Sequence, residues 1–372
     1  MSVNNKNLKW TIIGGGNGGQ SVAGHLGLMG FSVKLYDIIP ETVEKINEQG
    51  GIFLEGIVNG FGKVELATNN IEEALKDTDI IMIIVPSLAH KEIAKMCAPH
   101  LVDGQIVFLH PGATFGALAF HKIIEDEDCN ANVIIAESNT LIYACRLIEP
   151  GRARILGVKD RILVAALPAN ETDRVVKILN AAYKEVEAAE NVMVTSFDNT
   201  NPIVHPTTTL LCTGLVESNR DWLFYWDGFT PSIGSFLEEL DQERIAVGNA
   251  LGLNLITCKK QYELEYGVCE DTLEQAVKNT QAYAEIKGQH SLNTRYILED
   301  IPMGLLPLAS MGKLLGVPVE RMETVIRFCE YFLHKDFSSN GRTVENLGLE
   351  NMTADEIMEF VKTGKKLKCN NQ

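Results

Sequence analysis

Short apolar runs and amphipathic stretches alternate along the first half of the chain. The run 79–85 (DIIMIIV) is the clearest example, because it is apolar after its first residue and stops at a proline. Continuous apolar runs are typical of strands in a parallel sheet that is covered on both faces. The alternation of such runs with helical stretches predicts a doubly wound α/β sheet. The expected strands are residues 10–13, 31–36, 79–85, 105–109, 133–136 and 161–166.

The pattern changes at about residue 190, beyond which apolar residues recur at helical spacing and clear strands disappear. A chain of 372 residues is too long for one ordinary core, so two domains are expected. The predicted fold class is an α/β Rossmann domain with a mainly parallel sheet in residues 1–190, followed by an all-α domain in residues 191–372. We expect the active site in the cleft between the two domains. The expected long helices of the second domain are residues 207–216, 232–251, 273–283, 304–315 and 321–332.

A glycine cluster separates the first expected strand from the first expected helix. Gly14, Gly16 and Gly19 in this cluster fall on the G-x-G-x-x-G spacing. In that context the first glycine permits a tight turn, the second lets a pyrophosphate approach the backbone, and the third lets helix and strand pack closely. Phosphates then bind the free N–H groups at the helix N-terminus. The cluster predicts a dinucleotide site, and the alternative is a purely structural turn.

Asp37 closes the second expected strand, where a carboxylate accepts hydrogen bonds from an adenosine ribose. The same charge repels a 2′-phosphate, and the next two residues, Ile38 and Ile39, supply no arginine to hold one. NAD is therefore the favoured cofactor, and NADP stays an open alternative. Ligands bind beyond the carboxyl ends of parallel strands, so residues 14–19, 85–87, 110–112 and 137–140 are expected to line one cleft. The predicted cofactor contacts are Gly14, Gly16, Asn17, Gly18, Gly19, Asp37 and Pro86.

Composition and charge limit the classes of partner. A net charge of −16 argues against nucleic acid, and it means that an anionic substrate must be held by local arginines. No apolar run reaches the roughly 18 residues of a membrane-spanning helix, and we see no signal peptide. The eight cysteines show no C-x-x-C spacing and fit reduced thiols in a cytoplasmic protein. The histidines form no H-E-x-x-H motif, so a metal site is not indicated.

His205 lies in residues 201–206 (NPIVHP), at the start of the first helix of the second domain. An isolated histidine near a helix start is more often structural than functional. Here the two flanking prolines stiffen the segment, and the expected interdomain cleft lies beside it. Histidine is also the side chain best suited to proton transfer near neutral pH. His205 is therefore the candidate catalytic acid and base.

Residues 295–304 (RYILEDIPMG) form the second candidate group. One interpretation is an acidic helix end before a proline. The other assigns a substrate carboxylate to Arg295, which would hold it bidentately. Asp300 would then bind one nitrogen of His205, fixing its tautomer and orientation and favouring the imidazolium. Glu299 is the alternative for that role.

A third segment, residues 137–146 (ESNTLIYACR), follows an expected strand end. By the carboxyl-end rule its polar side chains point into the cleft, and Ser138 and Thr140 are the candidate substrate contacts. The alternative is an ordinary polar loop.

Three motifs together resemble the opine dehydrogenase (octopine/nopaline dehydrogenase) family: N-P-x-x-H-P, R-Y-x-x-E-D-x-P-x-G and E-S-N-T-L-x-Y-A-x-R, behind a GGGNGG turn. The resemblance spans the whole chain. It implies an NAD(P)-binding domain joined to an all-helical domain. The implied reaction is a reversible reductive condensation of an amino acid's amine with an α-keto acid such as pyruvate. The family's catalytic histidine, its partner aspartate and its keto-acid-binding arginine correspond to His205, Asp300 and Arg295.

The motifs also leave alternatives open. Family members usually have proline at the position of Ile142 and often threonine at Ser138, so the amino acid substrate is undetermined. A related hydroxy-acid or ketopantoate-type dehydrogenase commonly uses a lysine on the first helix of the second domain, and residues 196–216 contain none. A non-catalytic NAD-binding protein is the third alternative. The aromatic residues 222–227 (WLFYWD) either wall the amine pocket or pack between helices, and the oligomeric state, a homodimer included, is open.

Overall fold

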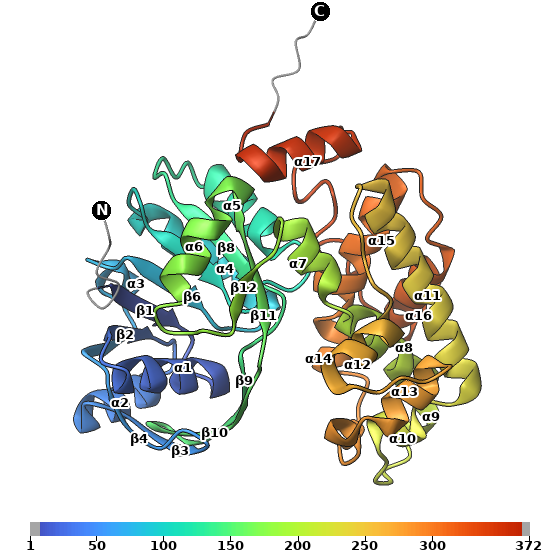
Figure 1. Ribbon diagram of the computed structural model, residues 1–372, viewed down its shortest axis with the longest axis horizontal. Helices are drawn as coiled ribbons and strands as arrows, with labels where there is room; N and C mark the ends of the chain where they lie inside the picture. The colour runs from blue at the N-terminus through green and yellow to red at the C-terminus, as the bar shows by residue number, and fades with distance from the viewer. Residues whose placement is uncertain (1–7, 367–372) are drawn as a thin grey trace, which may run out of the picture. The chain divides into compact units, whose positions relative to one another are not determined.

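The computed structural model describes residues 8–366. Two compact units emerge (Figure 1). Unit 1 comprises the chain up to Ser196 and the segment from Glu359 onward, and unit 2 runs from Phe197 to Met358. The boundary falls a few residues after the expected 190/191, and the last segment returns to unit 1. A Rossmann-type α/β unit joined to a helical unit confirms the predicted fold class.

The main sheet of unit 1 has eight strands in the order β12-β11-β8-β7-β6-β1-β2-β5. All neighbours pair in parallel except β8 and β11, which are antiparallel. All six strands expected from the sequence are present, and the two short edge strands β5 and β12 are additional. The strands are β1 (Lys9–Ile13), β2 (Ser32–Tyr36), β5 (Leu66–Thr68), β6 (Ile80–Ile83), β7 (Ile106–Leu109), β8 (Ile134–Ser138), β11 (Ile162–Leu167) and β12 (Val186–Ala188).

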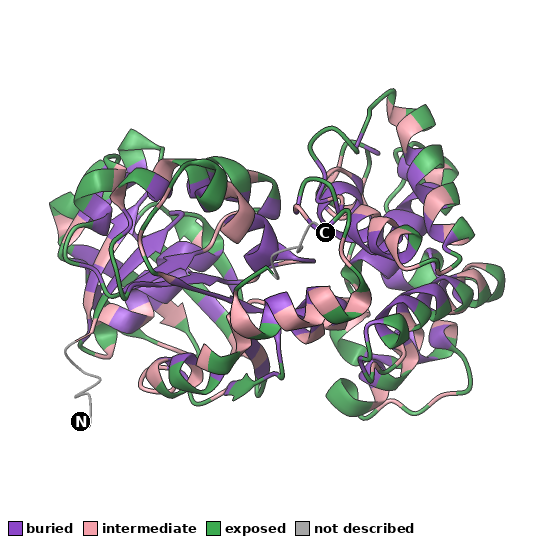
Figure 2. Ribbon diagram, turned by 90° about the horizontal axis from the view of Figure 1, so that it is seen from above, coloured by how far each residue is buried: buried purple, intermediate pink, exposed green. Residues whose placement is uncertain are grey.

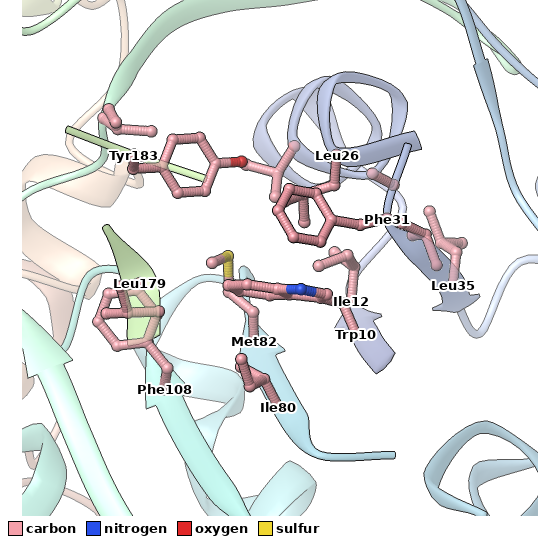
Figure 3. Packing of buried hydrophobic residues seen from close by; sticks show 14 of the residues in the cluster. Trp10, Ile12, Leu26, Phe31, Leu35, Ile80, Met82, Phe108, Leu179 and Tyr183 are labelled. Carbon is pink, nitrogen blue, oxygen red and sulfur yellow. The ribbon is translucent and has the colours of Figure 1, made fainter. Parts of the chain in front are cut away.

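The core of unit 1 lies on both faces of this sheet. Every residue of β6 and of β7 is buried. Side chains from β1, β2, β6 and β7 meet those of the first helix (Figure 3), and the ring of Trp10 meets Phe31 edge-on with centroids 5.9 Å apart. Figure 2 shows buried strands between helices whose outer faces are exposed. Coverage on both faces explains why the strand sequences are continuously apolar rather than alternating.

The helices of unit 1 bury one face each. In α4 the buried residues are His90, Ile93, Ala94 and Cys97, which is the spacing of one helical face. Two helices, α7 and α17, cross the boundaries between the units. The helices are α1 (Asn17–Leu28), α2 (Pro40–Gln49), α3 (Ile71–Leu75), α4 (His90–Cys97), α5 (Gly116–Asp126), α6 (Thr172–Leu179), α7 (Val192–Asp198) and α17 (Ala354–Thr363).

A second sheet, in the order β4-β3-β10-β9, packs on α1. One hairpin of this sheet consists of β3 (Gly51–Gly56) and β4 (Gly60–Lys63). The sequence analysis did not predict the other hairpin, of β9 (Tyr143–Glu149) and β10 (Arg152–Val158), which joins the sheet by parallel pairing with β3. Buried and exposed residues alternate along the first half of β9 and through most of β10, as expected for a sheet with one face on the core.

Unit 2 is helical, and its strand-like pairing is an isolated bridge between Leu223 and Lys287. The guanidinium of Arg244, at the centre of the longest helix, is 1 % exposed. It donates to Asp241 on the same helix and to the backbone carbonyls of Phe197 and Ile256, which ties three segments together. The helices are α8 (Asn201–Leu211), α9 (Thr213–Val216), α10 (Phe224–Asp227), α11 (Pro231–Ala250), α12 (Cys258–Tyr266), α13 (Leu273–Asn279), α14 (Arg295–Leu298), the π-helical η6 (Ile301–Leu305), α15 (Leu306–Leu314) and α16 (Glu320–Leu333).

The seven cysteines in the described part of the chain are free thiols, and Cys369 lies outside it. Over residues 8–366 no helix combines the length and the apolar character that a membrane span requires.

Candidate functional site

The glycine cluster follows β1 directly and is shaped by close backbone approach. Gly14 has a φ of +108°, and a Cβ there would overlap the carbonyl oxygen of Ile84. A Cβ at Gly19, on the first turn of α1, would overlap the carbonyl oxygen of Gly14. Gly16 differs, because a Cβ there would meet no heavy atom within 4 Å. The tight turn explains Gly14, and the close helix contact explains Gly19. The open space over Gly16 fits the approach of a ligand.

The N-terminus of α1 is open to an anion. Its N-cap residue, Gly16, provides no side-chain cap for the helix N–H groups. The Asn17 side-chain oxygen accepts from the backbone N–H of Leu147 on β9 at 3.0 Å, and so does not cap the helix either. Uncapped N–H groups and the positive end of the helix dipole together favour a phosphate. These features fit the pyrophosphate of a dinucleotide.

Asp37 lies beside the glycine cluster, at the end of β2. One carboxylate oxygen accepts from the backbone N–H of Gly15, and the other accepts from Ile39 at 2.8 Å. The residue is only 9 % exposed, so its carboxylate is held in one orientation. A carboxylate offers about four lone-pair positions, which leaves acceptor capacity for a ribose hydroxyl.

Gln20 is a part of this loop that the sequence analysis missed. Its side chain is fully buried, and its amide nitrogen donates to the carbonyl of Gly15 at 2.6 Å. Its side-chain oxygen accepts from the backbone N–H of Gly151, in the β9–β10 turn, at 2.8 Å. Gln20 thus anchors the glycine cluster to the second sheet.

Pro86, another predicted cofactor contact, follows β6, and its carbonyl accepts from the backbone N–H of Ala89 at 2.8 Å.

The segment after β8 is held from inside the unit. The hydroxyl of Ser138, 1 % exposed, donates to the carbonyl of Thr140 at 2.9 Å and lies 2.7 Å from Nδ1 of His110. Thr140 in turn accepts from the ammonium of Lys159 at 2.8 Å through its own hydroxyl. Both candidate substrate contacts therefore have partners of their own.

Glu137, at the end of β8, is fully buried and accepts hydrogen bonds from two helices. Its donors include the backbone N–H of Ala117 at 2.7 Å and the hydroxyls of Thr195 and Ser196 at 2.7 and 2.8 Å. This carboxylate fixes the start of α5 and α7 to the sheet.

His205 lies in the first half of α8, between two prolines. Pro202 occupies the first turn, where a missing N–H costs nothing, whereas Pro206 lies inside the helix and removes one backbone hydrogen bond. The hydroxyl of Thr209 donates to the carbonyl of His205 at 2.7 Å. The His205 side chain is 11 % exposed, so both of its nitrogens need partners.

Nδ1 of His205 lies 2.8 Å from a carboxylate oxygen of Asp300. Asp300 is therefore the carboxylate that the structure places against the ring, as one of the two interpretations expected. Asp300 directly precedes the π-helical η6, where the wider backbone turn alters the direction of the side chains. Burial raises the pKa of the Asp300 carboxyl, and its hydrogen bond to His205 opposes that rise.

Aromatic residues that the sequence analysis did not assign surround the imidazole. The hydroxyl of Tyr225 lies 3.1 Å from Nε2 of His205. The ring of Tyr296 stacks on the imidazole at 4.0 Å with an interplanar angle of 9°. Phe224 meets the imidazole edge-on at 6.0 Å. Tyr225 belongs to the aromatic stretch 222–227, but nothing in the sequence shows which of its rings faces His205.

Arg295 begins α14, five residues before Asp300. Its Nε donates to a carboxylate oxygen of Glu299 at 2.6 Å. The Arg295 side chain is 76 % exposed, whereas that of Glu299 is 8 % exposed. The buried carboxylate therefore orients an otherwise exposed guanidinium, whose two terminal nitrogens can hold a carboxylate. Across residues 8–366 no group of three or more His, Cys, Asp or Glu side chains is arranged to hold a metal.

Comparisons with known proteins match the two parts of the chain to two different domain families. Residues 188–333 match the alpha-helical domain of NAD/NADP octopine/nopaline dehydrogenase, and residues 9–134 match the N-terminus of NAD-dependent glycerol-3-phosphate dehydrogenase. The fold matches octopine dehydrogenase with NADH and pyruvate at a TM-score of 0.79, with 20 % identity over 97 % of this chain and 99 % of that one. It also matches NADP⁺-bound yersinopine dehydrogenase at 0.71, with 15 % identity over 96 % and 98 %.

The sequence is 36 % identical to the opine dehydrogenase of Arthrobacter sp. (strain 1C), over 95 % of this chain and 98 % of that one. Identity of this extent over nearly the full length of both proteins shows common ancestry. The chain belongs to the opine dehydrogenase family of NAD(P)-dependent oxidoreductases.

Proposed function

We propose that this enzyme condenses the amine of an amino acid with an α-keto acid, with pyruvate as the first candidate, and reduces the resulting imine at the expense of NADH. The observation that carries the proposal is the pair formed by His205 and Asp300, which contact each other across 95 residues of sequence. The family membership supports the proposal. So does the solved structure of octopine dehydrogenase, which was determined with NADH and pyruvate.

Unit 1 has the features that the cofactor needs. We propose that the backbone at Gly14, Gly16, Asn17, Gly18 and Gly19 binds the pyrophosphate, with Pro86 beside it, and that Asp37 binds the adenosine ribose. The carboxylate of Asp37 favours NADH over NADPH, because it would repel a 2′-phosphate. When bound, the cofactor supplies the hydride for the imine carbon.

The free thiols of the described cysteines support the cytoplasmic location proposed from the sequence.

His205 is proposed to move the protons of the condensation. The amine adds to the keto carbonyl to give a carbinolamine, and the imidazolium donates a proton to its hydroxyl, which leaves as water. Asp300 holds Nδ1, so that Nε2 is the nitrogen that exchanges the proton. Acid–base catalysis of this kind contributes roughly 10²–10⁴-fold to the rate.

Arg295 is proposed to bind the keto acid's carboxylate through its terminal nitrogens, with Glu299 holding Nε. A local cation is needed there because the chain as a whole is strongly acidic. Ser138 and Thr140 are proposed substrate contacts for the amino acid. The identity of that amino acid is the part of the function that the site leaves to experiment.

The test measures NADH oxidation with pyruvate against a panel of amino acids. We expect turnover with a subset of them, and a loss of about 10²–10⁴-fold in the His205→Ala variant while NADH still binds, as followed by nicotinamide fluorescence. The matched control is His290→Ala, because the side chain of His290 is 45 % exposed and lies 3.7 Å from Asp221, another exposed residue. Failure to oxidise NADH with every pair would favour a non-catalytic NAD-binding protein. Near-normal turnover by His205→Ala would remove the proposed role of this histidine.

A further inference from the structure

The hydroxyl of Tyr225 is bonded to the nitrogen of His205 that the proposed reaction uses. Nδ1 faces Asp300 at 2.8 Å, so Nε2 is the nitrogen left for the substrate. Nε2 lies 3.1 Å from the Tyr225 hydroxyl, and Tyr225 is 7 % exposed. The nitrogen that the proposed reaction uses is therefore partnered inside unit 2.

The ring of Tyr225 is held in place by its aromatic neighbours. It stacks on Tyr283 with centroids 4.3 Å apart and an interplanar angle of 16°. Phe224 meets it edge-on at 4.9 Å, and Phe229 lies at 5.8 Å. Rings packed on several sides lose their rotational freedom during folding, so the hydroxyl is aimed at His205 without a further entropic cost.

A phenol is suited to a ring that changes its protonation state. When the imidazole is neutral with its proton on Nδ1, the Tyr225 hydroxyl donates to Nε2. When the imidazole is protonated, Nε2–H donates to the same hydroxyl oxygen. A backbone N–H or a carbonyl could partner only one of these states. Tyr225 can therefore keep Nε2 satisfied on both sides of the proton transfer.

We propose that Tyr225 is a positioning residue of the active site, which acts through His205 by holding Nε2 in both of its protonation states. The proposal rests on the acid–base role proposed for His205. Together with Asp300 on Nδ1 and the stacked ring of Tyr296, the hydroxyl fixes the position of the imidazole on three sides. A carbinolamine oxygen reaches Nε2 by sharing or replacing this one hydroxyl.

Removing the hydroxyl affects the two protonation states unequally. Hydrogen bonds from a charged donor are roughly twice as strong as neutral ones, so the imidazolium loses more than the neutral ring. The titratable neighbours that remain would be unchanged: Asp300 and Tyr296 beside His205, and Tyr266 and Tyr283 beside Tyr225. We therefore expect Tyr225→Phe to impair proton donation while leaving substrate binding largely intact.

The first measurement is direct and does not need activity. Histidine labelled with ¹⁵N in the full-length protein reports the protonation and hydrogen bonding of each ring nitrogen by NMR, and His205→Ala assigns the His205 signals. We expect the Nε2 resonance of His205 to move in Tyr225→Phe and to stay in Tyr283→Phe. Tyr283 is the matched control, because its hydroxyl bonds to Tyr266 at 3.1 Å in the same aromatic cluster. An unmoved Nε2 resonance in Tyr225→Phe would overturn the proposal.

The second measurement is kinetic. We expect Tyr225→Phe to lower kcat about five- to tenfold with the KM for the keto acid within twofold, which corresponds to one lost hydrogen bond. The fall of kcat/KM at high pH is expected to move to lower pH, because the imidazolium loses a hydrogen-bond acceptor. Tyr283→Phe should retain both values, and thermal unfolding should show both variants folded.

The outcomes separate this proposal from the one on which it rests. If kcat and the pH profile of Tyr225→Phe equal those of Tyr283→Phe, the hydroxyl has no positioning role, whatever its NMR signal. If instead His205→Ala retains near-normal turnover, the proposed acid–base role fails. In that case the NMR comparison still decides whether the two side chains are bonded.

Discussion

Two histidines show how differently the two units use buried polar side chains. His110, just after β7 in unit 1, is 2 % exposed, and His205 in unit 2 is 9 % exposed. Both rings have a partner on each nitrogen. Nε2 of His110 accepts from the backbone N–H of Ile142 at 3.2 Å, and its Nδ1 lies 2.7 Å from the Ser138 hydroxyl. His205 has a carboxylate and a phenol instead.

The chemistry of the partners, rather than burial, separates the structural histidine, His110, from the proposed catalytic one, His205. A backbone N–H only donates, so a proton on Nε2 of His110 would break its bond to Ile142. Burial lowers the pKa of His110 to about 3, and nearby Lys159 acts in the same direction. At His205 the partner of Nδ1 is the Asp300 carboxylate, and the Tyr225 hydroxyl beside Nε2 can either donate or accept. The same side chain therefore has a structural environment in unit 1 and, in unit 2, an environment that suits the proposed proton transfer.

The largest effect on stability is expected in unit 1, where the backbone of α1 at Gly19 lies against the carbonyl oxygen of Gly14. In Gly19→Ala the new methyl group would overlap the carbonyl oxygen of Gly14, so the helix or the turn must move. We expect a loss of about 3 kcal/mol in the free energy of unfolding, at the upper end of overpacking costs, together with loss of NADH binding. Urea unfolding and NADH fluorescence titration measure the two effects.

Gly16→Ala is the matched control, because a Cβ there meets no heavy atom within 4 Å. Its free energy of unfolding should stay within about 1 kcal/mol of the parent protein, which allows for a weaker N-cap. NADH affinity should still fall, since the methyl group occupies the space proposed for the pyrophosphate. Equal stability of the two variants would contradict the assignment of Gly19 to helix packing.

The next effect concerns acid stability, and it separates the two histidines directly. The pKa of His110 is about 3 in the folded protein and about 6.5 in the unfolded chain, so between these values the unfolded chain binds more protons. The contribution of His110 to the free energy of unfolding is therefore fully present above pH 6.5. It falls with decreasing pH, by at most about 1.4 kcal/mol per pH unit. At pH 5 the loss due to His110 is about 2 kcal/mol.

The measurement is the free energy of unfolding of the parent and of His110→Gln between pH 7.5 and 5. Glutamine keeps a donor and an acceptor but does not titrate, so the variant should lose less stability on acidification. His290→Gln serves as the control, since the His290 side chain is 45 % exposed. Parallel pH dependences of the parent and His110→Gln would show that His110 does not resist protonation.

Much of unit 1 was predictable because its signals are local in sequence. The strands are continuous apolar runs, and the glycine spacing lies within one turn and one helix. The hairpin of β9 and β10 was missed although buried and exposed residues alternate in it, because its polar residues resemble a loop until α1 and β3 are in place. Glu137 was expected to line a cleft, whereas it is buried by donors from α5 and α7.

The site of unit 2 was predictable only in part. The pairing of His205 with Asp300 was one interpretation of residues 295–304, which left Glu299 as an alternative, and the family motifs favoured it, since no local pattern links residues 95 positions apart. Tyr225 and Tyr296 reach the imidazole through tertiary packing, and an aromatic stretch gives no sign of which ring will face a given side chain. Side-chain sites assembled from distant helices leave weaker traces in a sequence than backbone sites built at one turn.

The smallest effect is expected at Arg295, an exposed side chain of unit 2 that is proposed to bind the keto acid's carboxylate. Arg295→Ala should raise the KM for the keto acid about tenfold, the value of one charge-assisted hydrogen bond at a partly hydrated site, with a smaller change in kcat. Arg295→Lys keeps the charge but loses the planar fork, so an intermediate KM is expected. Steady-state kinetics with pyruvate varied at saturating amino acid, and the reverse, measure both. If only the KM for the amino acid rises, Arg295 binds the other substrate and the keto acid's carboxylate must be held elsewhere.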